Sequence, residues 1–174
     1  MPAVGQTKAP AKDRPAPVVA AKPKAPAPAP RAVAAPKVTP ADEFLRQFEG
    51  SWDALAMYTA GGRFTVAWSA AVVEWAVGKG CKFRVEPADG SGVITGSVLP
   101  GVDGAWVVKF AMGESVLEVP TQFEEGKGFR GQKIVGTDTL FAKVGRGERN
   151  LEIAIESPLG KHTVIGTEFA TKKP

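Results

Sequence analysis

The chain has 174 residues, of which 22 are Lys or Arg and 18 are Asp or Glu, so its net charge is +4. Residues 1–40 hold seven basic residues and one acidic residue, a net charge of +6, which leaves −2 for residues 41–174. The basic character thus belongs to the N-terminal segment, and the rest of the chain is not composed like a nucleic-acid-binding domain.

Residues 1–38 form a segment rich in proline and alanine with dispersed positive charges. Ten of the fifteen prolines lie within residues 1–40, and no aromatic residue, leucine or isoleucine precedes Pro40. Such a segment cannot bury enough apolar surface to offset the entropy lost on ordering. The sequence therefore predicts a disordered basic tail, which acts either as a solubilising tether or as a docking segment for an anionic polymer or surface.

Apolar runs are short throughout the chain. The longest run near the start, Val18–Ala21, is too short for the core of a secretory signal. No stretch approaches the roughly 20 apolar residues that span a bilayer. We therefore expect a cytoplasmic protein without a membrane span.

A second region, residues 39–174, begins with helix-capping residues. Thr39 can cap a helix, Pro40 suits the first helical position, and Asp42 completes a capping box. Gly50 suits the left-handed position just past a helix end. The spacing predicts one helix of about ten residues, whose apolar face carries Phe44, Leu45 and Phe48.

The remainder alternates between apolar and polar side chains with a period of two. The clearest segments are RFTVAWS (63–69), CKFRVE (81–86) and NLEIAIE (150–156). This pattern is typical of half-buried antiparallel strands. Glycine-rich turns separate nine or ten such segments, and no helical segment lies between any two of them, which excludes βαβ units. We predict an all-β fold: an antiparallel up-and-down barrel of about nine to ten strands behind one short N-terminal helix.

The junction between helix and first strand reads Gly50-Ser51-Trp52. A short helix followed by this G-x-W motif resembles the lipocalin-like (calycin) barrels, and the stretch VEWAVGKGCKFRVE (73–86) is similar to an uncharacterised bacterial lipocalin-like family. The resemblance implies that Gly50 and Trp52 close one end of the barrel under the helix. It implies no established activity.

A barrel of this kind either holds a small apolar or amphipathic ligand or is filled by its own side chains. Alternation nominates six aromatic residues to line the interior: Phe64, Trp68, Phe83, Trp106, Phe110 and Phe141. Cys81 begins an alternating strand, where a buried and unreactive thiol is expected. With one cysteine and one histidine, no metal site of the usual zinc ligands is expected. We identify no catalytic constellation.

His162 lies in SPLGKHTVIGTEFA (157–170), which is similar to the region of nitrobindins that carries their haem-ligating histidine. That resemblance implies a haem-binding barrel with His162 as the ligand. Strand parity instead places His162 on the face of Glu168, so an exposed histidine and no cofactor is our first expectation.

Three functions remain open. The first is a non-enzymatic binding module for a small apolar or amphipathic ligand. The alternatives to it are a tethered interaction protein whose tail docks on an anionic polymer or surface, and a nitrobindin-like haem-binding barrel that uses His162. The second class is thus an interaction protein, and the third is an enzyme. The sequence leaves the ligand and the oligomeric state open.

Overall fold

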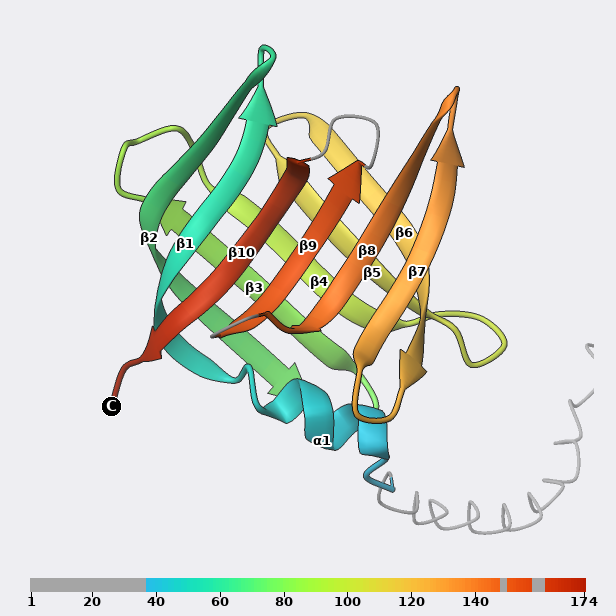
Figure 1. The fold of residues 1–174 in the computed structure, drawn as a ribbon. Coiled ribbons are helices and arrows are strands. Elements are labelled where there is room, and N and C mark those ends of the chain that lie inside the picture. The colour runs from blue at the N-terminus through green and yellow to red at the C-terminus, as the bar shows by residue number, and fades with distance from the viewer. Residues whose placement is uncertain (1–36, 148–149, 158–161) are drawn as a thin grey trace, which may run out of the picture. The chain divides into compact units, whose positions relative to one another are not determined.

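A computed structural model describes residues 37–147, 150–157 and 162–174, with His162 described by its backbone only. Residues 1–36, which hold nearly all of the predicted disordered tail, lie outside the described residues. The described part contains one helix and a closed antiparallel barrel (Figure 1). This confirms the predicted all-β barrel with a short N-terminal helix.

The barrel has ten strands, and each pairs with its neighbours in sequence until β1 closes on β10. Their bounds are β1 Gly50–Ala60, β2 Arg63–Ala76, β3 Gly80–Pro87, β4 Ile94–Pro100, β5 Trp106–Met112, β6 Ser115–Glu124, β7 Gly128–Val135, β8 Asp138–Arg146, β9 Leu151–Ser157 and β10 His162–Lys172. The meander order is the one predicted from the glycine-rich turns.

The helix α1, Pro40–Arg46, begins with the predicted capping box. The backbone N–H of Asp42 donates to the Thr39 hydroxyl, and the Thr39 N–H donates to the Asp42 carboxylate at 3.0 Å. Asp42 also accepts a 2.8 Å hydrogen bond from the N–H of Gly78, in the turn between β2 and β3. Burial alone would raise the pKa of Asp42, but the hydrogen bonds from Thr39 and Gly78 outweigh it and lower the pKa. The cap therefore also fastens the helix to the barrel.

The helix is seven residues long and not about ten as predicted. Its continuation tightens: the N–H groups of Gln47, Phe48 and Glu49 each bond a carbonyl only three residues back. Gly50 does not end the helix but begins β1, and its φ of 120° lets the chain turn into the strand.

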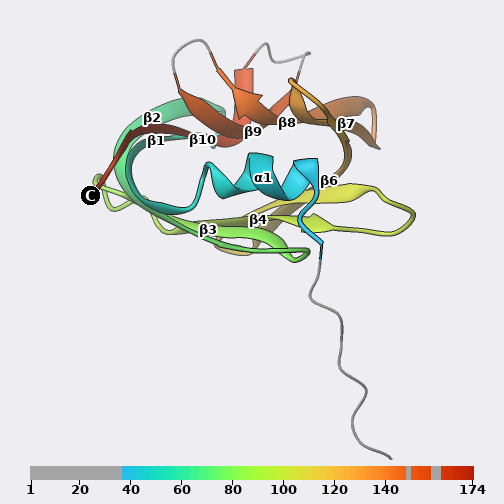
Figure 2. The same cartoon turned by 90° about the horizontal axis from the view of Figure 1, so that it is seen from below.

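One end of the barrel is covered by α1, as the view along the barrel shows (Figure 2). Leu45 and Phe48 are fully buried there, and Trp52 is 8 % exposed. The indole Nε1 of Trp52 donates a 2.7 Å hydrogen bond to the Phe48 carbonyl, and its ring packs edge-on against Phe169. These contacts agree with the closure role that the G-x-W resemblance implied for Trp52.

The barrel interior is occupied by apolar side chains that form one cluster with the helix. Large side chains come from strands around most of the barrel, among them Phe83 of β3, Phe110 of β5, Phe129 of β7 and Phe169 of β10. The inward residues in the middle of β1 and β2 are small, namely Ala54, Ala56, Ala67, Ser69 and Ala71, while the larger Trp52 and Tyr58 lie nearer the ends of β1. A small barrel has room for only some large residues, so opposite walls complement each other in size.

Candidate functional site

The structure does not bring the six predicted lining residues together. Phe83 and Phe110 point inward and are 4 % and 1 % exposed, with ring centroids 5.1 Å apart. Trp106 is half-buried farther along the interior and packs 5.1 Å from Phe129. These three residues belong to the packed interior.

The inward orientation predicted for the other three is wrong. Phe64 and Trp68 lie on the outer face of β2, 49 % and 63 % exposed, and Phe141 lies on the outer face of β8, 39 % exposed. Both faces of β2 are apolar. The face with the smaller side chains points into the barrel, because aromatic rings from the opposite wall already fill the interior. None of these three side chains lines the interior.

A groove of about 530 Å³ lies on the outer surface of the barrel. The groove runs across four neighbouring strands, β2 to β5, and the strand register explains its lining. One row of paired residues crosses it as Val72, Arg84, Thr95 and Ala111, and the next row as Glu74, Lys82, Ser97 and Lys109. Residues paired in this way share a face of the sheet, so both rows point outward.

The floor of the groove is apolar because of a glycine. Gly96 lies between the two rows, and a Cβ on it would collide with the Phe83 ring and lie 2.6 Å from the Lys109 carbonyl oxygen. The Phe83 ring therefore lies directly beneath Gly96 and contributes to the groove lining from the interior side. The small side chains of Thr95, Ser97 and Ala111 line the middle of the groove, while the longer side chains of Lys82, Arg84 and Lys109 form its rim.

Cations dominate the rim of this groove. Arg84 pairs with Glu86 at 2.7 Å, and Lys109 pairs with Glu118 at 2.7 Å. The hydrogen bond from Lys109 lowers the pKa of Glu118, so this pair is charged at neutral pH. Lys82 has no ion pair among the residues that the structure describes, and its register neighbours are Glu74 and Ser97. Lys82 is thus the cation best placed to meet an anionic group.

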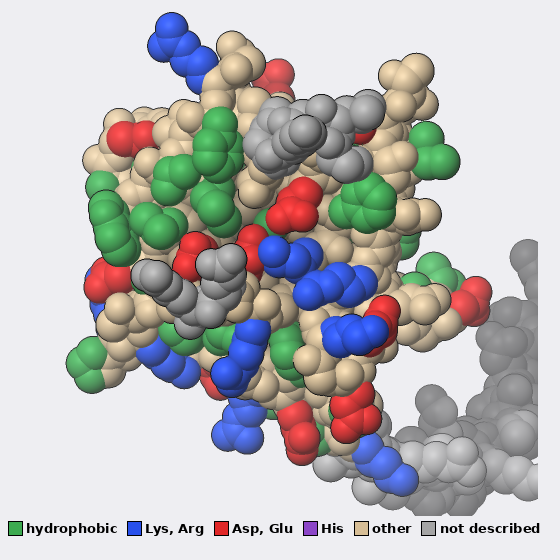
Figure 3. Space-filling view, in the orientation of Figure 1, with side chains coloured by type: hydrophobic (Ala, Val, Ile, Leu, Met, Phe, Trp, Pro, Cys, Tyr) green, Lys and Arg blue, Asp and Glu red, His purple; other side chains and the backbone are tan. Residues whose placement is uncertain are grey.

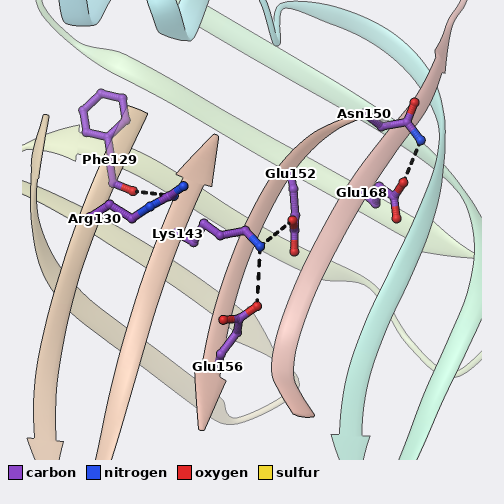
Figure 4. A network of polar contacts seen from close by, with 7 residues as sticks. All are labelled: Phe129, Arg130, Lys143, Asn150, Glu152, Glu156 and Glu168. Atoms are coloured by element: carbon purple, nitrogen blue, oxygen red, sulfur yellow. Dashed lines mark hydrogen bonds and ion pairs between the residues drawn. The ribbon is translucent and has the colours of Figure 1, made fainter. Parts of the chain in front are cut away.

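A second polar cluster lies on the outer face of β7 to β10 (Figure 4). Lys143 lies between two carboxylates, 2.8 Å from Glu152 and 3.6 Å from Glu156, and Asn150 donates to Glu168 at 2.6 Å. These charges already satisfy one another, so we interpret the cluster as a clamp between strands. Burial alone would lower the pKa of Lys143. The hydrogen bond to Glu152 and the negative charges of Glu152 and Glu156 outweigh this effect, so the pKa of Lys143 is raised.

Replacement of Lys143 by methionine is expected to lower the free energy of unfolding by about 1–2 kcal/mol at pH 7, because Glu152 is left half-buried and unpaired. A raised lysine pKa contributes stability that is complete below the unfolded-state pKa, ~10.5, and is lost as the pH rises through the higher folded-state value. Urea unfolding should therefore show that the stability difference between wild type and Lys143→Met narrows as the pH rises above the unfolded-state value. Lys109→Met is the control, because this ion pair is exposed and screened by solvent and should therefore contribute little to stability. Equal losses in the two variants would contradict the clamp.

Cys81 and His162 were the other residues of interest. Cys81 is 1 % exposed, and burial raises the pKa of its thiol to about 12, which agrees with an unreactive core residue. The His162 side chain lies outside the described residues, so the expected exposed histidine without haem and the haem-binding alternative both stay predictions. Among the described side chains, no group of three or more His, Cys, Asp or Glu residues is arranged to hold a metal ion. In the same part of the chain, no helix has the length and apolar character to cross a membrane.

Comparison of the chain with protein-family models, with curated proteins and with solved structures gave no match. The closed ten-strand barrel is compatible with a calycin-like fold, and this likeness rests on its topology. The sequence indicated only part of the groove: the alternating charged residues Lys82, Arg84 and Glu86 marked the outer face of one strand. The position of the groove depends on the register of four strands, which alternation alone does not give.

Proposed function

We propose that the barrel is a binding module that takes a small amphipathic ligand, an anionic head with an apolar body, in the outer groove of β2 to β5. The observation that carries this proposal is the combination of an apolar floor with a cationic rim in one hollow. A volume of about 530 Å³ lies in the range of small-molecule sites, about 300–1,000 Å³. The sequence analysis also expected a binding module, but it placed the ligand inside the barrel, whereas we propose the outer groove.

The apolar body of the ligand would lie along the row that begins at Val72. This side chain is 48 % exposed, and Ala111 ends the same row on β5. The Phe83 ring beneath Gly96 extends the apolar floor between them. Covering this surface removes apolar area from water, which favours binding by about 25 cal/mol per Å² before the costs of association.

The head group would lie against Lys82 and Ser97, which are direct register partners on β3 and β4. A carboxylate or phosphate accepts charge-assisted hydrogen bonds from an ammonium and a hydroxyl. Arg84 and Lys109 are held by their own glutamate partners and add positive potential at the rim. The arrangement therefore favours an anionic head over a neutral or cationic one.

The test is isothermal titration of the full-length protein with three probes of one chain length: dodecanoate, dodecanol and dodecyltrimethylammonium, each below its micelle concentration. We expect dodecanoate to bind most tightly. Ala111→Phe should abolish binding by filling the groove, and Lys82→Gln should weaken it about five-fold, since an exposed charge-assisted bond contributes ~1 kcal/mol.

Lys133→Gln, at an exposed lysine on β7, is the matched control and should bind as the wild type does. The proposal fails if the three probes bind equally well, or if Lys133→Gln weakens dodecanoate binding as much as Lys82→Gln. Either result would indicate adsorption to apolar surface in general.

One observation favours the interior as a second candidate site. The Thr167 hydroxyl on β10 is fully buried and has no hydrogen-bond partner among the described residues. Buried hydroxyls are usually satisfied by protein, water or a bound molecule. A ligand or water inside the barrel would account for this hydroxyl, and amide shifts during titration with dodecanoate would distinguish the interior from the outer groove.

A further inference from the structure

The outer face of β2 carries a stripe of exposed apolar side chains, which we call the β2 stripe. Its members are Phe64 at 49 % exposure, Val66 at 52 %, Trp68 at 63 % and Val72 at 48 %. Figure 3 shows hydrophobic side chains gathered over the region of β1 and β2, whereas charged side chains gather over β8 and β9. Single exposed apolar residues are common, but a contiguous row with two aromatic residues marks an interaction surface.

The stripe is widened by the neighbouring strand. Leu55 and Met57 of β1 pair with Trp68 and Val66 and share their outward face. From the size of such side chains, the β2 stripe exposes on the order of 400 Å² of apolar surface. A standard interface buries about 800 Å² on each partner, a little over half of it apolar. The patch thus has the apolar area that one side of a stable dimer needs.

We propose that a second copy of this chain covers the β2 stripe, with the two β2 strands stacked antiparallel across a two-fold axis. The outward residues follow one another as Phe64, Val66, Trp68, Ala70, Val72 and Glu74. With the axis between Trp68 and Ala70, each Trp68 indole faces the small Ala70 of the partner subunit, and each Val66 faces Val72 of the partner subunit. A face that alternates large and small residues about its centre is complementary to itself, as a two-fold contact requires.

Val72 and Glu74 also line the groove of the proposed function, so the dimer would cover the β2 edge of that groove, and a partner subunit and a ligand would compete for Val72. Phe64, Val66 and Trp68 lie outside the groove lining, so Trp68→Asp tests the dimer without changing the groove. The two proposals can therefore fail separately.

Sedimentation velocity of the full-length protein between about 1 and 100 µM tests the proposal; the wild type should dimerise within this range. Trp68→Asp should weaken dimerisation at least ten-fold, because it places a charge at the centre of the contact. Ile134→Asp, at a 74 % exposed residue of β7, is the matched control and should dimerise as the wild type does. Circular dichroism should show both variants folded, since both side chains are exposed.

The proposal is overturned if the wild type stays monomeric, or if Ile134→Asp disrupts the dimer and Trp68→Asp does not. A monomer that binds phosphatidylcholine vesicles through Trp68 would assign the stripe to a lipid surface instead.

Discussion

Replacement of Trp52 by alanine is expected to lower the free energy of unfolding by about 3–5 kcal/mol, the typical cost of truncating a buried tryptophan. The indole is 8 % exposed, packs against Phe169 and donates its N–H to the Phe48 carbonyl. Truncation leaves a cavity under α1 and an unsatisfied carbonyl on Phe48. Since a domain usually has only about 5–15 kcal/mol of stability, urea unfolding should show a barely folded protein.

Trp52→Phe is the companion variant. It keeps most of the apolar volume but loses the hydrogen bond to Phe48, so it should stay folded at intermediate stability. A loss within about 1 kcal/mol for Trp52→Ala would show that the indole does not close the barrel end. The likeness to calycin barrels would then lose its most specific residue.

Gly96→Ala is expected to destabilise the protein by about 1–3 kcal/mol, the usual cost of overpacking. The added methyl would collide with the Phe83 ring and with the Lys109 carbonyl oxygen, and neither can move without shifting the sheet. The backbone of Gly96 imposes no left-handed φ, so the effect is steric alone. Chemical denaturation measures the loss.

A double variant provides the control. Phe83→Leu together with Gly96→Ala removes the ring that the methyl meets, so the loss on adding the methyl should shrink. If Gly96→Ala costs the same with leucine at position 83 as with phenylalanine, the ring does not lie beneath the glycine. The description of the groove floor would then be wrong.

The local signals in the sequence predicted the fold well. The capping box at Thr39 and Asp42 depends on four consecutive residues, and it forms as predicted. The alternation in β3 allowed only one orientation of the strand. One face carries the charged residues Lys82, Arg84 and Glu86, and the other carries the apolar residues Cys81, Phe83 and Val85. The helix length was overestimated because three tight turns continue its path after Arg46.

The orientation of β2 could not be predicted in the same way. Its two faces are Phe64, Val66, Trp68 on one side and Ala67, Ser69, Ala71 on the other, and both are compatible with burial. The choice depends on how much space the opposite wall leaves, which is a property of the closed barrel. The groove depends likewise on the register of four strands, and so only its charged residues were visible in the sequence.

Amide spectra of the isotope-labelled full-length protein, recorded during titration with dodecanoate, show whether a ligand binds on the outer face of β2 to β5. We expect saturable shifts along the row of Val72, Arg84, Thr95 and Ala111. The amides of Val119 and Ile153, whose side chains are buried in the interior, should stay unchanged. Shifts concentrated around Thr167 and these interior residues, with the outer row unaffected, would place the ligand inside the barrel, and the proposed outer site would be wrong.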